Sequence, residues 1–128
     1  MSRLLFLIHG MWATPHAWRH WRGYFEARGW HVVAPALRHH EAASLEPAKG
    51  LGTTSLLDYA ADLEARLRHL PAAPVIVGHG MGGLLAQILA ARGLASASVL
   101  LCPTPPAALG LRRPSAWRPL IRSQMRWG

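Results

Sequence analysis

Blocks of consecutive apolar residues alternate along the chain with segments in which apolar residues recur every three or four positions. Four short apolar runs are typical of strands that are buried on both faces: 3–8, 30–35, 74–78 and 97–103. Helical periodicity predicts helices between these runs, over residues 14–29, 55–70 and 83–92. This alternation indicates an α/β fold with a parallel sheet and helices on both of its faces.

The helix expected over 55–70 carries the strongest local signals. Ser55 followed three residues later by Asp58 forms a capping box at its start. Leucines spaced along one face predict the buried side of the helix. On the opposite face, acidic and basic residues one helical turn apart are predicted to form two ion pairs: Asp62 with Arg66 and Glu64 with Arg68.

Composition sets limits on the kind of protein. The chain has 128 residues, of which 51% are hydrophobic, so it is one domain's worth of material with enough apolar side chains for a core. Its one cysteine, Cys102, excludes an internal disulfide and a cysteine-based metal site, and its place at the end of an apolar run predicts burial. The first apolar run is too short for a signal peptide or a membrane span, and we therefore expect a cytoplasmic protein.

Charge is distributed unevenly. All six acidic residues lie within the first 64 positions, where six Lys or Arg residues balance them, and eight arginines without an acid follow. We interpret this excess as the mark of a fragment whose acidic counterpart lies elsewhere, rather than of nucleic-acid binding. The basic tail has apolar residues along one helical face, which fits either the first helix of a lid or a helix in weak contact with a membrane surface.

A glycine cluster, "GHGMGG" over residues 78–83, follows the third strand and opens the third helix. It is one residue away from the G-x-S-x-G nucleophile elbow, with Gly80 at the serine position. It also satisfies the G-x-G-x-x-G pattern of a dinucleotide-binding turn. That pattern requires an acidic residue about 20 positions later to hold the ribose, and no acid follows Glu64. Dinucleotide binding stays an alternative.

A second motif, the loop "HGMW" over residues 9–12, follows the first strand. This loop and the glycine cluster together resemble the α/β-hydrolase fold family, in its esterase and lipase branch, and the resemblance covers the whole chain. The resemblance implies the sheet order 2-1-3-4 for the four strands. The first and third strands are then neighbours, and the loops that follow them meet at one crevice.

The resemblance also implies roles for particular residues. Gly80 occupies the position of the catalytic serine, between the elbow glycines Gly78 and Gly82. The backbone N–H groups of Met11 and Met81 are expected to form the oxyanion hole. Trp12 is expected to contact a small apolar acyl or ester substrate, and the family chemistry requires neither a cofactor nor a metal.

The chain departs from the family pattern at the positions of the catalytic residues. Gly80 has no hydroxyl, no acid follows Glu64 and no histidine follows His79, so a Ser-His-Asp triad cannot be assembled. We therefore expect residues 1–110 to be the N-terminal half of an α/β-hydrolase core and 111–128 a lid helix or basic amphipathic tail. We expect a carboxylic-ester or acyl hydrolase type of domain that is inactive as written. The alternative is a non-catalytic ligand-binding or interaction protein on this fold.

Other polar residues receive structural interpretations. His9 and His79 are expected to support their loops rather than act as bases. The run Arg38-His39-His40 is expected to be a solvated loop, because two histidines without a placed acid do not specify a metal site. The sequence carries no prediction of the oligomeric state.

Overall fold

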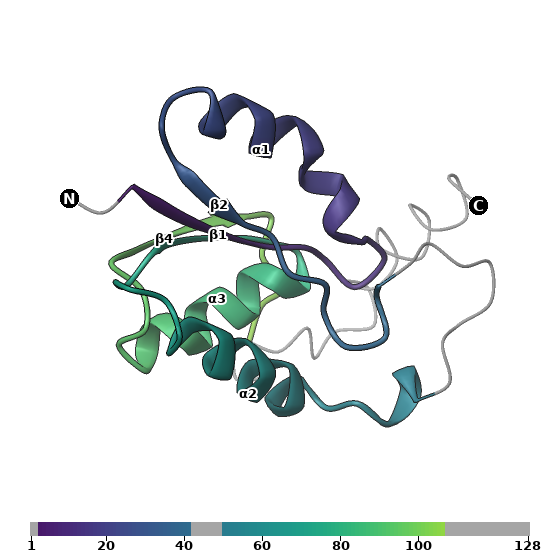
Figure 1. The fold of residues 1–128 in the computed structure, drawn as a ribbon. Coiled ribbons are helices and arrows are strands. Elements are labelled where there is room, and N and C mark those ends of the chain that lie inside the picture. The colour runs from purple at the N-terminus through teal and green to yellow at the C-terminus, as the bar shows by residue number, and fades with distance from the viewer. Residues whose placement is uncertain (1–2, 42–49, 107–128) are drawn as a thin grey trace.

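The sheet is the centre of the fold (Figure 1). The computed structural model describes residues 3–41 and 50–106. Its four strands are all parallel and follow the order β2-β1-β3-β4. Their bounds are β1 Leu4–Ile8, β2 His31–Val33, β3 Val75–His79 and β4 Ala97–Leu101. The fold class and the order 2-1-3-4 expected from the sequence are confirmed.

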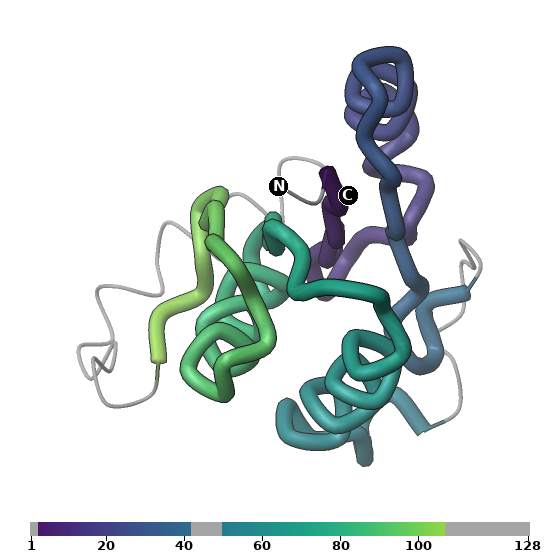
Figure 2. Tube along the Cα trace, turned by 60° about the vertical axis from the view of Figure 1, so that its left-hand side comes forward, coloured from purple at the N-terminus to yellow at the C-terminus, as the bar shows by residue number. Residues whose placement is uncertain are grey.

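Helices cover both faces of this sheet. One face carries a short 3-10 helix followed by α1, and the other carries α2 and α3, as Figures 1 and 2 show from two directions. The bounds are η1 Pro15–Trp18, α1 Arg19–Glu26, η2 Leu51–Thr53, α2 Leu56–Leu67 and α3 Met81–Ala91. Successive side chains of a strand point to opposite faces of the sheet. Because helices cover both faces, the central strands are buried on both sides.

Two apolar clusters hold the layers together. The larger joins alternate residues of the central strands to α2 and α3, with Phe6, Ile8 and Ile76 fully buried against Leu63 and Leu85. The smaller lies on the opposite face and joins β1 to the first helical segment: Leu5, Leu7, Trp18, Val32 and Val77. The apolar runs of the two central strands, β1 and β3, correspond to strands with both faces in a core.

Several element boundaries differ from those expected. The segment over 14–29 begins as a 3-10 turn and becomes α-helical only at Arg19, and Thr14 makes no side-chain cap that would start an α-helix directly. The third helix starts at Met81 rather than at 83, immediately after the turn at Gly80. The second strand is shorter than expected.

The polar face of α2 is only partly as predicted. The capping box between Ser55 and Asp58 is confirmed, and Glu64 pairs with Arg68 as expected. Asp62 does not pair with Arg66. It accepts two hydrogen bonds from Arg38, at 2.9 Å from Nε and 2.7 Å from Nη2. A guanidinium matches both carboxylate oxygens at once, and this makes the pairing across the fold the more specific one.

The β4 strand has an exposed edge within the described part of the chain. It pairs with β3 alone, and four of its five residues are exposed, including Val99 and Leu100. The expected burial of Cys102 is wrong, because the chain turns away from the sheet there with φ at 43° and the thiol is exposed. The boundary at residue 110 and the tail over 111–128 lie outside the described residues.

We expect this exposed strand to promote self-association of the 128-residue polypeptide, because unpaired strand edges with apolar side chains recruit further strands. Replacing Leu100 by lysine should lower the association constant. Leu57→Lys is the matched control, since Leu57 is an exposed leucine on α2. Sedimentation equilibrium measures both variants, and equal effects of the two substitutions, or a wild-type chain that stays monomeric at high concentration, would contradict the expectation.

Candidate functional site

The turn between β3 and α3 places a single residue above the end of the sheet. Gly80 has φ 57° and ψ −120°, a left-handed conformation that strains any residue with a Cβ. Its N–H donates to the carbonyl of Leu101 at 3.1 Å, and its carbonyl accepts from the N–H of Thr104 at 2.9 Å. The turn is thus fixed to the end of β4 on both sides of this residue.

Close backbone contacts shape the same turn. A Cβ at Gly82 would overlap the carbonyl oxygen of Ile8 at the end of β1, and a Cβ at Gly78 would overlap the carbonyl oxygen of Gly82. Only glycine lets α3 rise from the sheet this closely to both strands. A Cβ at Gly80, by contrast, would find Gly10 Cα at 3.9 Å and nothing nearer. Residue 80 therefore has room for a side chain, and residues 78 and 82 do not.

The loop after β1 lies directly beside this turn. The pairing of β1 with β3 is in register from Leu5 with Val75 to Ile8 with Gly78, so the two strands end level. A Cβ at Gly10 would lie 3.3 Å from both Nδ1 and the carbonyl oxygen of His79. The two loops that the sequence analysis placed at one crevice are adjacent.

His9 supports the loop from the buried side. Its Nε2 accepts the N–H of Leu37 at 3.2 Å, so the proton must be on Nδ1, which donates to the carbonyl of Gly10 at 2.8 Å. Burial lowers the pKa of His9, against a smaller opposing effect of the Gly10 hydrogen bond, and the neighbouring His40 lowers it further. This neutral ring agrees with a structural role.

Backbone geometry sets the direction of the N–H groups of Met11 and Met81, the two amides expected to form the oxyanion hole. A trans peptide points its N–H away from its carbonyl. Since the Gly10 carbonyl faces the His9 ring, the N–H of Met11 points away from that ring. The Gly80 carbonyl accepts from Gly83 and Thr104, so the N–H of Met81 points away from both. Within the described residues neither amide donates to a protein acceptor.

A cavity of about 280 Å³ lies next to the turn. Its lining is largely apolar and combines both loops with the first helical segment and β4: His9, Gly10, Ala13, Ala17, Trp18, Trp21, His79 and Leu101. The two tryptophans meet edge to face, with ring centroids 5.4 Å apart. Trp12, which was expected to contact substrate, is 81% exposed and does not line this cavity.

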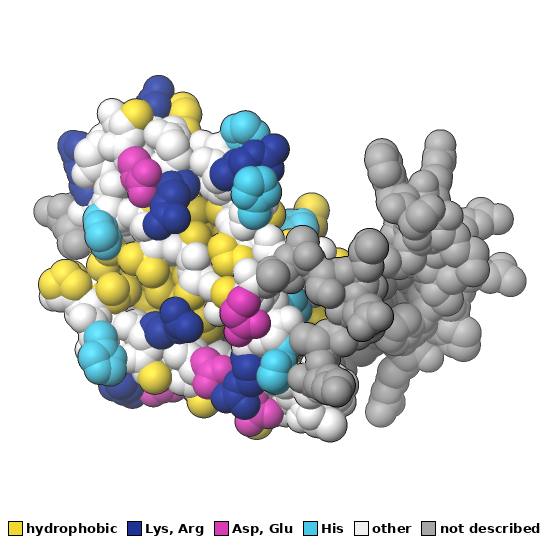
Figure 3. All heavy atoms as spheres, turned by 45° about the vertical axis from the view of Figure 1, so that its right-hand side comes forward, with side chains coloured by type: hydrophobic (Ala, Val, Ile, Leu, Met, Phe, Trp, Pro, Cys, Tyr) yellow, Lys and Arg dark blue, Asp and Glu magenta, His cyan; other side chains and the backbone are white. Residues whose placement is uncertain are grey.

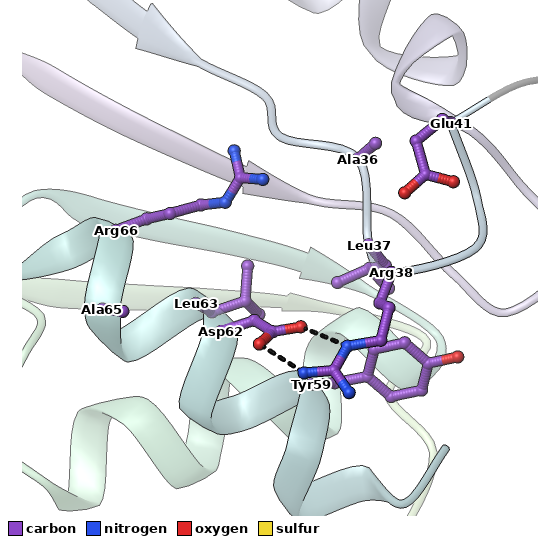
Figure 4. Close-up of a pocket in the computed structure, with 9 residues that line it drawn as sticks. All are labelled: Ala36, Leu37, Arg38, Glu41, Tyr59, Asp62, Leu63, Ala65 and Arg66. Atoms are coloured by element: carbon purple, nitrogen blue, oxygen red, sulfur yellow. Dashed lines mark hydrogen bonds and ion pairs between the residues drawn. The ribbon is translucent and has the colours of Figure 1, made fainter. Parts of the chain in front are cut away.

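A larger hollow of about 410 Å³ lies between α2 and the loop after β2 (Figure 4). The Arg38–Asp62 pair occupies it, with the Tyr59 ring beside the guanidinium, and Arg66 extends along it from the next turn of α2. This hollow shares no residue with the loops after β1 and β3. Its most prominent charges already neutralise each other, and we place the candidate site at the smaller cavity.

The surface carries charge of both signs. On the face in Figure 3, an area of apolar side chains is bordered by basic, acidic and histidine side chains rather than by a continuous basic stripe. Among residues 3–41 and 50–106, no three potential ligands are grouped as a metal site would require. In the same residues, no helix has the length and apolar character needed to cross a membrane.

Sequence reasoning missed one buried polar residue near the site. The run Arg38-His39-His40 is not uniformly a solvated loop, because His40 is only 6% exposed and contacts the carbonyl of Met11 at 2.9 Å. Met11 and His40 are 29 positions apart, and no local sequence pattern predicts their contact. Helical spacing does place Trp21 on the apolar side of its helix, where its ring packs against the buried Trp18 although the residue is 37% exposed.

The glycine contacts predict a ranking of alanine variants. Gly80→Ala should lower the free energy of unfolding by about 1–3 kcal/mol through backbone strain, and Gly82→Ala by about 3 kcal/mol or more through overlap with β1. Gly23→Ala, inside α1 with nothing within 4 Å of the added Cβ, should be neutral or stabilising. Urea unfolding measures all three, and a Gly82 variant as stable as the Gly23 variant would contradict the packing described.

Comparison with known proteins agrees with this geometry. The alpha/beta hydrolase family matches residues 5–128. A thioesterase domain from the curacin biosynthetic pathway is 29% identical with a TM-score of 0.70, over 93% of this chain and 43% of that domain. A comparison with curated proteins finds no match.

Two further solved structures share the fold. An extracellular alpha/beta-hydrolase from a Paenibacillus species is 19% identical with a TM-score of 0.67, over 80% of this chain and 41% of that one. A methylesterase from Arabidopsis is 18% identical with a TM-score of 0.66, over 80% of this chain and 44% of that one. The chain thus spans less than half the length of each of these structures. With the family matched over nearly all of its residues, and with the turn at Gly80 in place, the chain belongs to the alpha/beta hydrolase family.

Proposed function

We propose that this chain carries the acyl-binding part of a carboxylic-ester or thioester hydrolase site, in which residue 80 takes the nucleophile's position without supplying a nucleophile. The observation that carries the proposal is the left-handed turn at Gly80 beside the Gly10–Met11 loop. In the proposal, the N–H groups of Met11 and Met81 bind the oxygen of an acyl group, and the neighbouring cavity takes its apolar chain.

Two backbone donors suit such an oxygen because their direction is fixed before a ligand arrives. An oxyanion in acyl transfer is stabilised by preorganised N–H groups, typically by about 3–4 kcal/mol for each donor. Both amides here belong to peptides whose carbonyls are held by other groups. The apolar lining supplied by Ala13, Ala17 and the two tryptophans fits the hydrocarbon part of a small ester rather than a charged ligand.

The names of the similar structures support the same class of substrate. They include a thioesterase and a methylesterase, both of which act on acyl compounds. The 29% identity with the thioesterase domain extends over 93% of this chain.

Chemistry by a serine route is not available to these residues. Gly80 offers no hydroxyl, and none of the acidic residues lines the cavity. His79 is exposed beside the turn and has no carboxylate to orient it among the cavity residues. We therefore propose that residues 1–128 bind acyl compounds without turning them over, which is also the behaviour of a non-catalytic binding protein on this fold.

Hydrolysis of p-nitrophenyl butyrate tests this proposal. The wild-type chain should not exceed the solvent rate, and Gly80→Ser should not raise it, because a serine without a base and an orienting acid is a weak nucleophile. Gly80→Ala is the matched control, since it adds the same Cβ and the same strain without a hydroxyl.

The comparison of the two variants isolates the hydroxyl. Saturable turnover by the wild-type chain would overturn the claim that position 80 is the missing nucleophile. Turnover by the serine variant that the alanine variant lacks would show that a base within these residues activates it, and His79 would then be the residue to replace.

A further inference from the structure

His40 links two loops that are distant in sequence. The side chain lies in the loop after β2, yet it reaches back to the loop after β1, where its Nε2 is 2.9 Å from the carbonyl oxygen of Met11. Its Nδ1 is 2.9 Å from the carbonyl oxygen of Arg38 in its own loop. Only 6% of the residue is exposed, so water cannot readily replace either contact.

Both partners of this ring are acceptors. A carbonyl oxygen has no proton to give, so each ring nitrogen must donate if both contacts are hydrogen bonds. The contact that joins the two loops is that of Nε2, so the link between them needs a proton on Nε2.

The groups that face this ring come from three elements. The His9 ring at the end of β1 has its centroid 5.3 Å away, and its hydrogen bonds define a neutral ring. From α2, the Tyr59 ring lies 5.8 Å away in an edge-to-face arrangement. The loop of His40 itself contributes Arg38, His39 and Glu41, and Glu41 accepts the N–H of His39 at 3.2 Å.

We propose that His40 is a positioning residue for the candidate site, a buried ring whose Nε2 N–H clamps the Met11 carbonyl to the loop after β2. The proposal deepens the proposed function and rests on it for its effect on ligands. His9 holds the peptide before the Met11 Cα and His40 holds the peptide after it. With both peptides fixed, the Met11 backbone cannot rotate, and its N–H keeps one direction.

The proton on Nε2 can be observed directly and without a ligand. In long-range ¹H–¹⁵N spectra of the full chain, His40 should carry a proton on Nε2, whereas the protonated nitrogen of His9 should be Nδ1. A His40 ring without a proton on Nε2 would overturn the proposal.

Two substitutions test the positioning. His40→Leu removes the Nε2 donor and should shift the ¹³C resonance of the Met11 carbonyl and weaken binding of sodium hexanoate about tenfold, the effect of losing one hydrogen bond. Tryptophan fluorescence reports that binding, because Trp18 and Trp21 line the cavity. His40→Gln, which keeps a donor, should recover part of both effects. His69→Leu is the control, since His69 is exposed just after α2 and, among the described residues, its ring hydrogen-bonds only to the carbonyl of Ala65.

The outcomes separate this proposal from the proposed function. Unchanged Met11 carbonyl resonance and hexanoate affinity in a folded His40→Leu chain would overturn the clamp. If the wild-type chain does not bind hexanoate, the proposed function fails, and the ring and carbonyl resonances still decide on His40. If the leucine variant does not fold, the ring measurement on the wild-type chain and the glutamine variant decide.

Discussion

The contact between the start of α3 and the end of β1 is the constraint on which the site depends. At Gly82 the helix backbone comes so close to the carbonyl of Ile8 that a Cβ would overlap it. This approach makes the chain turn sharply after β3, and the sharp turn forces residue 80 into a left-handed conformation above the sheet. The position of the site is therefore a result of backbone packing, and it does not require a reactive side chain at residue 80.

The rest of the site follows from that approach. Because β1 and β3 end level, the Gly10 loop meets the turn at Gly80, and the amides of Met11 and Met81 lie on adjacent loops. The first helical segment and the end of β4 complete an apolar cavity beside them. Glycine adopts the conformation at residue 80 without strain, so the turn and the cavity do not depend on a side chain there.

The sequence predicted those features whose causes are local. Continuous apolar runs indicated buried parallel strands, Ser55 and Asp58 indicated the start of α2, and the glycine cluster indicated the turn. Contacts between distant segments could not be predicted from such patterns. Asp62 bonds to Arg38, 24 positions away, instead of to Arg66 on its own helix. His40 was assigned to a solvated loop because its partner on the β1 loop leaves no trace in the local sequence.

The central claim is that amides on two separate loops form one site for an acyl oxygen. Backbone ¹H–¹⁵N spectra recorded during a titration with sodium hexanoate test it most directly. The account predicts that the amide signals of Met11 and Met81 shift together and saturate with a single dissociation constant. Signals that respond with different constants, or a bound hexanoate that moves neither amide, would contradict it.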